Sequence, residues 1–223
     1  YEIRNCDWSS DVCSSDLTDA AGNSSVAAST SFTLDTQVAA PTVMLLTDSG
    51  SSSSDQLSNV GTLSVSGNEA SALVEYSPDN ASWSSTPPAV TQGANTVYVR
   101  QIDLAGNVST ATAFSFTFDN QVAAPTVALS NDSGVSNSDK ISNDGTLTIS
   151  GLETGAQVEY SSNNASWSST APTLSQGANT IYVRQIDRAG NISSATAFSF
   201  TYDNQVAAPT VTLSADKIGR AHV

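Results

Sequence analysis

The sequence predicts an all-β protein with two tandem β-sandwich domains, and three observations support this prediction. A long segment, residues 41–124, recurs directly afterwards as residues 125–208. Short stretches rich in β-branched and aromatic residues alternate with clusters of Gly, Asn, Asp and Pro, which is typical of strands joined by turns. No stretch of about eleven residues keeps the apolar period of a helix.

Two motifs define the repeat. VAAP occurs at Val38–Pro41, Val122–Pro125 and Val206–Pro209, and YVRQID occurs at Tyr98–Asp103 and Tyr182–Asp187, with one common spacing. This period of about 84 residues exceeds the 20 to 50 residues of solenoid repeats, so each repeat is expected to fold as an independent small domain.

The domain boundaries follow from this period. Residues 41–124 and 125–208 are complete repeats and are identical at 59 of 84 aligned positions. Residues 18–40 match the end of a preceding repeat with its linker, and residues 209–216 begin another. We therefore interpret the sequence as a window from a longer array.

The two ends, residues 1–17 and 217–223, share no pattern with the repeats. KIGRAHV can be encoded as AAG ATC GGA AGA GCA CAC GTC, and the reverse complement of all but its first base encodes residues 11–17. Both ends thus resemble a translated sequencing adapter and are left out of the fold prediction. They hold both cysteines and the only histidine, so residues 18–216 offer no disulfide and no haem or zinc site.

The first complete repeat is expected to form seven short strands, at residues 42–46, 62–66, 73–76, 82–84, 89–91, 96–102 and 111–118. In the sixth, Val97 and Val99 share one face and Tyr98 and Arg100 share the other. Seven short strands in about 80 residues without a cysteine are typical of an immunoglobulin-like β-sandwich.

The charge composition excludes several classes of partner. The chain has 21 acidic and 7 basic residues, for a formal charge of −14. Such an acidic protein is a poor ligand for nucleic acid or for an anionic membrane. No run of about eighteen apolar residues is present, so the sequence predicts no membrane insertion.

The acidic residues recur at equivalent turns of the repeats. With seven strands, the first inter-strand loop should lie at the pole where the chain leaves the sandwich, and the last loop at the pole where it enters. The junction between the repeats should therefore gather a complete oxygen-ligand set from both sides: Asp48, Asp55, Asp119, Asp187 and Asn191. Partial sets should form at the neighbouring junctions: Asp35, Asp103, Asn107, Asp132, Asp139 and Asp203.

Converging carboxylates repel one another unless their pKa values rise or a cation binds. Ca²⁺ accepts six to eight oxygen ligands in flexible geometry, so it suits this set better than Mg²⁺. We therefore predict a structural Ca²⁺ at the junction. Asp and Asn also favour turns for local hydrogen bonding, and the sequence leaves that interpretation open.

Four segments carry a family resemblance: NDSGVSNSDKISNDGTLTISG, VEYSSNNASW, GANTIYVRQIDRAGN and FSFTYDNQVAAPTV. Together they resemble the tandem bacterial Ig-like domains of giant repetitive surface adhesins, including those exported by type I secretion. The resemblance covers residues 18–216. It implies an extracellular stalk whose partners are the neighbouring repeats of the same chain, often stiffened by calcium at the junctions. It does not identify an external ligand.

The sequence gives little support for catalysis. Without His or Cys, a nucleophile would need a Ser activated by Lys or a carboxylate, and neither G-x-S-x-G nor S-x-x-K occurs in the repeats. We therefore expect no enzyme. Arg100 and Arg184 are expected to form local ion pairs or to cover apolar surface.

A binding module is the rival interpretation, with each sandwich recognising a glycan or a protein, for example within a secreted polysaccharide-active protein. Exposed Trp83 and Trp167 beside a groove would favour it. We expect instead that each tryptophan packs over its own core, as a large aromatic does in many small β-domains.

Overall fold

The computed structural model describes residues 12–15, 18–26 and 28–212. Of the two ends that resemble an adapter, only Val12–Ser15 falls among them, and the rest lies outside the described residues. All the regular secondary structure in the described part of the chain is β-strand. No helix in that part could span a membrane.

The chain divides into two compact units. The first contains the described residues up to Leu46 together with Gly61–Thr117. The second contains Thr47–Val60 together with the described residues from Phe118 onward. The loop Thr47–Val60 of the first repeat thus belongs by its contacts to the second unit.

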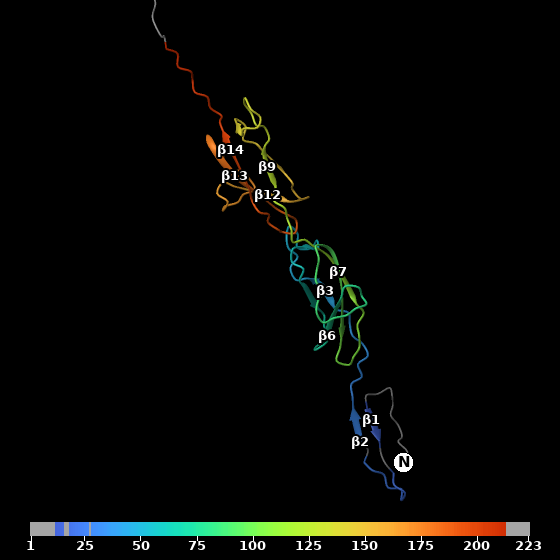
Figure 1. Ribbon diagram of the computed structural model, residues 1–223. Coiled ribbons are helices and arrows are strands. Elements are labelled where there is room, and N and C mark those ends of the chain that lie inside the picture. Colours follow the sequence, from blue (N-terminus) through green and yellow to red (C-terminus); the bar gives the residue numbers. More distant parts are fainter. Residues whose placement is uncertain (1–11, 16–17, 27, 213–223) are drawn as a thin grey trace, which may run out of the picture. The chain divides into compact units, whose positions relative to one another are not determined.

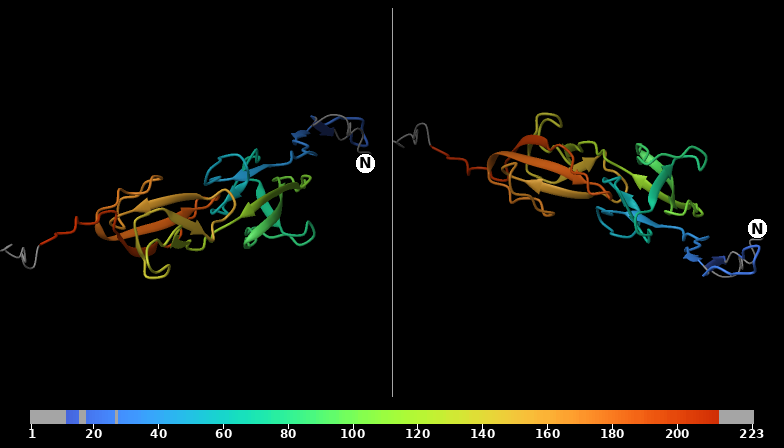
Figure 2. Two further views of the ribbon diagram at one scale, coloured as in Figure 1. Left: turned by 90° about the horizontal axis from the view of Figure 1, so that it is seen from above. Right: turned by 90° about the horizontal axis from the view of Figure 1, so that it is seen from below.

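The second unit has two sheets. The smaller pairs β9 (Thr126–Leu129) with β11 (Leu147–Ser150) in antiparallel register. The larger has four strands in the order β10 (Ile141–Ser142), β14 (Thr196–Tyr202), β13 (Gly177–Ile186) and β12 (Gln157–Ser161). Figure 1 labels most of these strands, and Figure 2 shows the long strands β13 and β14 running side by side.

The core of this unit draws residues from both sheets. Val127 comes from β9, Ile181 and Val183 from β13, and Phe198 and Phe200 from β14, and all five are buried. Because one face of each sheet supplies these side chains, the unit is a β-sandwich.

The first repeat has the same strands. In its smaller sheet, β3 (Thr42–Leu45) pairs with β5 (Leu63–Ser66). In its larger sheet the order is β4 (Leu57–Ser58), β8 (Thr112–Phe118), β7 (Gly93–Ile102) and β6 (Leu73–Ser77). The predicted all-β sandwich fold is therefore confirmed.

The segment before the first repeat contains one further strand pair and a turn. Strand β1 (Val12–Ser15) pairs with β2 (Ala28–Ser31). Between them, the backbone of Asp19 and Asn23 forms a hydrogen bond of 2.9 Å, and the equivalent bond between Asp103 and Asn107 measures 3.1 Å. The turn near the end of each repeat is thus built in the same way.

Most predicted strands are present, but two are not, and one strand that was not predicted appears. Residues 89–91 form no strand, because the amide of Thr91 donates to the side chain of Asn95 at 2.9 Å instead of to a strand partner. Residues 82–84 contribute only one bridge, between Tyr76 and Ser84. Strand β4 was not predicted, since it is two residues long and lies within a turn-rich loop.

Candidate metal centre

Carboxylate oxygens of Asp119, Glu153 and Asp187 lie within 4.8 Å of one another in the second unit. We call these three residues the second acidic trio. Three equivalent residues, each one repeat length earlier in the sequence, form the first acidic trio in the first unit: Asp35, Glu69 and Asp103. The same arrangement therefore occurs twice in the chain.

Strand ends position the second acidic trio. Asp119 follows the last residue of β8, and its amide donates to the carbonyl oxygen of Ser58 at 2.9 Å. Asp187 follows the last residue of β13. Glu153 lies in the turn that connects β11 to β12, where its carbonyl accepts a hydrogen bond from the amide of Ala156 at 3.1 Å.

Asn191 holds two members of the second acidic trio together. Its side-chain nitrogen donates to the carbonyl oxygen of Asp119 and to Oδ2 of Asp187, each at 2.7 Å. Its backbone amide donates to Oδ1 of Asp187 at 2.8 Å. Asp187 is only 5% exposed, so these bonds satisfy a carboxylate that is almost fully buried.

The first acidic trio is built in the same way. Asn107 donates from its side chain to the carbonyl oxygen of Asp35 at 3.0 Å and to Asp103 at 2.7 Å. Burial of the Asp103 carboxyl raises its pKa, but hydrogen bonds from Asn107 and from nearby amides outweigh burial, so the pKa lies below its ordinary value. Asp103 is therefore ionised at neutral pH, as a metal ligand must be.

Turn chemistry explains part of this arrangement. Asp19 accepts hydrogen bonds from the side chain and the backbone of Asn23, as Asp187 does from Asn191. An Asp-x-x-x-Asn turn thus stabilises itself through local hydrogen bonds. The turn alone does not account for the two further carboxylates, Asp119 and Glu153, that lie beside Asp187.

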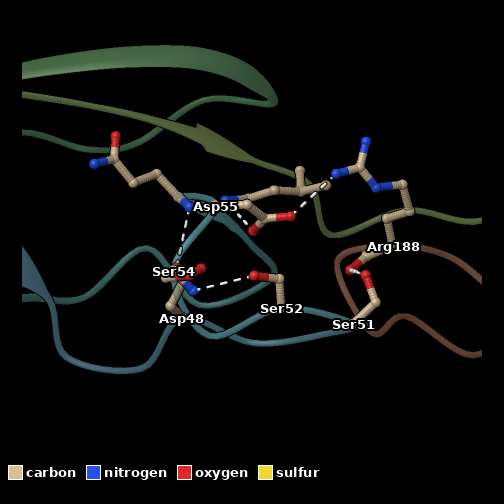
Figure 3. Close-up of polar contacts among 8 residues, drawn as sticks. Asp48, Ser51, Ser52, Ser54, Asp55 and Arg188 are labelled. Carbon is tan, nitrogen blue, oxygen red and sulfur yellow. Dashed lines mark hydrogen bonds and ion pairs between the residues drawn. The ribbon is translucent and has the colours of Figure 1, made fainter.

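Two residues predicted to join this site, Asp48 and Asp55, are placed elsewhere. Figure 3 shows Asp55 paired with Arg188, with Oδ2 and the guanidinium nitrogen 3.1 Å apart. Asp48 accepts from the amide of Gln56 at 3.0 Å through Oδ2, while its Oδ1 is buried without a hydrogen-bond partner. The physical reason is local: the amides of Gln56 and Leu57 hold Asp48 and Asp55 in their own loop, as the equivalent amides hold Asp132 and Asp139 in the second repeat. Arg188 adds a charged partner for Asp55 alone, at a position where the first repeat has Leu104.

Backbone contacts accompany this ion pair within the second unit. The amide of Ser51 donates to the carbonyl oxygen of Arg188 at 3.0 Å, and the hydroxyl of Ser49 donates to that of Ala189 at 2.8 Å. Ala189 is fully buried. The loop Thr47–Val60 is thus held by several groups of the second repeat in addition to the charge pair.

The remaining predicted ligands lie in the equivalent loop of the second repeat and after its last strand. Asp132 accepts from the amide of Lys140 at 2.9 Å, and its Oδ1 is buried without a partner, as in Asp48. Asp139 accepts from the amide of Ile141 at 3.0 Å. Asp203 accepts from the side chain of Gln176 and donates its amide to Ser142 at 2.9 Å.

Sequence reasoning missed Glu69 and Glu153. They lie in equivalent loops and are the only acidic residues that the two repeats have between β5 and β6 or between β11 and β12. Their recurrence was visible in the sequence. The expected strand order also places their loop, which follows the second strand of the repeat, at the same pole as the last loop with Asp103 or Asp187, so the topological argument used for the other ligands could have included them.

The tryptophans were expected to pack over the core, but Trp167 is not part of the core cluster. Instead, Arg184 stacks on it with Cζ 4.1 Å from the ring centroid, and Arg100 stacks on Trp83 at the same distance. Each arginine also forms the expected ion pair, with N–O distances of 2.7 Å to Glu159 and Glu75 respectively.

These features define a class of protein: tandem immunoglobulin-like sandwiches in which a trio of acidic residues recurs with the repeat. The chain belongs to the bacterial Ig-like domain family, whose sequence pattern matches residues 37–120 and 121–204. These two matches cover more than half of the chain and have the period that the sequence predicts. No curated protein matches the chain significantly.

Proposed function

We propose that the chain is a structural spacer of a bacterial surface adhesin, in which Ca²⁺ bound by each acidic trio stiffens the connection between consecutive Ig-like repeats. The observation that carries this proposal is the composition of the second acidic trio. Asp119 follows the last strand of the first repeat, whereas Glu153 and Asp187 belong to loops of the second. A cation bound to all three would tie one repeat to the next.

The linker is suited to this role. Only Asn120–Ala124 separate Asp119 from Pro125, and proline restricts the backbone at the start of the next repeat. A cation that fixes Asp119 would remove much of the remaining freedom of so short a segment. The function is then mechanical, and an extended array would display a distant binding tip.

Ca²⁺ is the cation that suits the donor set best. Its ligands would be carboxylate oxygens from three separate loops, and Ca²⁺ accepts such oxygens in flexible geometry with water completing the shell. Extracellular modules bind it with Kd values of about 10⁻⁴ to 10⁻³ M. Location outside the cell, where Ca²⁺ reaches millimolar levels, is part of the proposal.

The contacts of the tryptophans leave at most one face of each ring for a glycan. A glycan platform needs an open aromatic face. One face of Trp83 and of Trp167 is covered by an arginine that is itself held by a glutamate.

Thermal unfolding of the full chain in EDTA and in about 10 mM CaCl₂ tests the proposal. For the Kd range above, Ca²⁺ should stabilise the folded state by about 1.4 to 2.7 kcal/mol per site, which raises Tm by several degrees. Asp119→Ala and Glu153→Gln should each remove the part of the shift that belongs to the second unit.

The matched control is Asp79→Asn. It removes one negative charge outside both acidic trios, at a position where the second repeat naturally has Asn163. Its calcium shift should equal that of the unmodified chain. A chain whose Tm is the same in EDTA and in CaCl₂ would rule out the calcium-stiffened spacer.

A further inference from the structure

We infer that Gln185 is a positioning residue that clamps the linker and the Glu153 turn to the sheet of the second repeat, and that Gln101 does the same in the first. Gln185 is completely buried, which is unusual for a polar side chain with a flexible stem. Its side-chain amide bonds to three backbone groups from two other segments of the chain.

These three contacts satisfy the buried amide. Its nitrogen donates to the carbonyl oxygen of Ala123 at 2.8 Å and to that of Gly151 at 3.1 Å. Its oxygen accepts from the amide of Glu153 at 2.9 Å. Two acceptors and one donor around the amide define its orientation, since a reversed amide would place its oxygen against the carbonyl oxygens of Ala123 and Gly151.

Strand geometry connects this clamp to the second acidic trio. Side chains two residues apart in a strand share a face, so Val183, Gln185 and Asp187 form one inward row at the end of β13. All three are buried, with exposures of 0%, 0% and 5%. Along this row the side chains change from apolar (Val183) to amide (Gln185) to carboxylate (Asp187) as the chain leaves the core. The clamp residue Gln185 is therefore the neighbour of Asp187 in this row, and Asp187 is a member of the second acidic trio.

The contacts of the clamp reach both segments that must meet Asp187. Ala123 lies in the linker that follows Asp119, and the Glu153 amide belongs to the residue whose side chain completes the trio. One buried side chain therefore orients both of them. In the first unit, Gln101 contacts Ala39 at 2.8 Å, Gly67 at 3.2 Å and the amide of Glu69 at 2.9 Å.

The clamp itself does not require a cation, but its effect on calcium affinity rests on the proposed function. A linker released from Gln185 would lose its fixed position, so Asp119 and Glu153 would meet the ion less often in the right geometry. Pre-organised ligands bind more tightly than mobile ones because less freedom is lost on binding. Gln185 should thus raise calcium affinity without touching the ion.

Amide hydrogen exchange of the full chain in EDTA tests the clamp. Gln185→Met keeps the length of the side chain but removes all three hydrogen bonds. Exchange should accelerate at least tenfold at the Glu153 amide, which donates to Gln185, while the Glu69 amide, which donates to Gln101, keeps the rate of the unmodified chain. Gln101→Met should produce the opposite pattern.

Val183→Ala is the matched destabilising control. It creates a cavity in the same inward row without touching the linker or the Glu153 turn, so it should accelerate exchange across the core strands and not selectively at the Glu153 amide. Unchanged exchange at the Glu153 amide of the Gln185→Met protein would overturn the inference. So would the same pattern in both variants.

Calorimetric titration with CaCl₂ separates this inference from the proposed function. Gln185→Met should weaken calcium binding at one of two sites by about tenfold or more. If the unmodified chain binds no calcium, the proposed function fails, and the exchange experiment still decides whether the clamp exists. If the chain binds calcium and the variant binds equally well, the positioning role in the site is overturned.

Discussion

Asp79 and Asn163 show which part of a side chain a turn requires. They occupy equivalent positions, and their Oδ1 atoms accept the same hydrogen bonds, from two backbone amides and a serine hydroxyl, at distances of 2.8 to 3.0 Å. The turn thus needs an oxygen acceptor and not a charge. The charge of Asp79 adds pH dependence to the first repeat alone.

The acid sensitivity of this turn can be predicted. Amides of Ser82 and Ala81, with the Ser77 hydroxyl, lower the pKa of Asp79 to about 2 from its ordinary value of 3.8. A lowered pKa stabilises the fold above pH 3.8, and this contribution is lost as the pH falls towards 2. Fluorescence of Trp83, four positions along the chain, should change in this window, and Asp79→Asn should remove the change.

The ion pair between Asp55 and Arg188 should contribute little to stability. The side chains are 23% and 52% exposed, and solvent screening limits the contribution of such a pair to stability to about 1 kcal/mol or less. Arg188→Leu, which copies the first repeat, should therefore lower the free energy of unfolding by no more than this amount in urea titrations. A loss more than twice as large would show that Arg188 does more than pair with Asp55.

At the scale of elements, the close approach of the loop Thr47–Val60 to residues 188–190 depends on Gly50. Gly50 has a φ of +93°, and a Cβ atom there would overlap the carbonyl oxygen of Arg188. Gly177 has a similar φ of +98°, but a Cβ atom there would meet nothing within 4 Å. Comparing alanine substitutions at the two positions therefore distinguishes the cost of a positive φ from the cost of steric overlap.

Alanine substitutions should reveal this difference. Gly177→Ala should cost about 1 to 2 kcal/mol through positive φ alone. Gly50→Ala should cost about 1 to 3 kcal/mol more, because the loop must move away from Arg188 or distort. Urea unfolding monitored by circular dichroism measures both, and equal costs would argue that the loop contact is not maintained in solution.

Strands were easier to predict than the acidic trios. Alternation in β7 assigns Val97 and Val99 to one face without saying which face is buried, and the structure shows that this face is the buried one, with exposures of 3% and 0%. Periodicity also found the repeat and the residues Asp119, Asp187 and Asn191. The expected strand order also places the loops of Glu153 and Arg188 at the junction. It does not specify which side chains meet there, so it could not predict that Asp55 pairs with Arg188 while Glu153 joins Asp119 and Asp187.

At the scale of the whole molecule, the acidic composition should make stability depend on salt. The chain carries a formal charge of −14, and the acidic trios concentrate part of that charge. In EDTA, raising NaCl from about 0.05 to 0.5 M should raise Tm by screening repulsion between carboxylates. With saturating CaCl₂ the rise should be smaller, and an equal rise in both buffers would place the repulsion outside the trios.

The spacing of the acidic trios has a genetic consequence. The members of each trio are evenly spaced along the sequence, and each member of the first trio precedes its counterpart in the second by one repeat length. Deleting residues 36–119 would put Asp35 in the place of Asp119, in register with Glu153 and Asp187. Unequal crossing-over between the near-identical repeats can therefore lengthen or shorten the gene while every remaining junction keeps its three carboxylates.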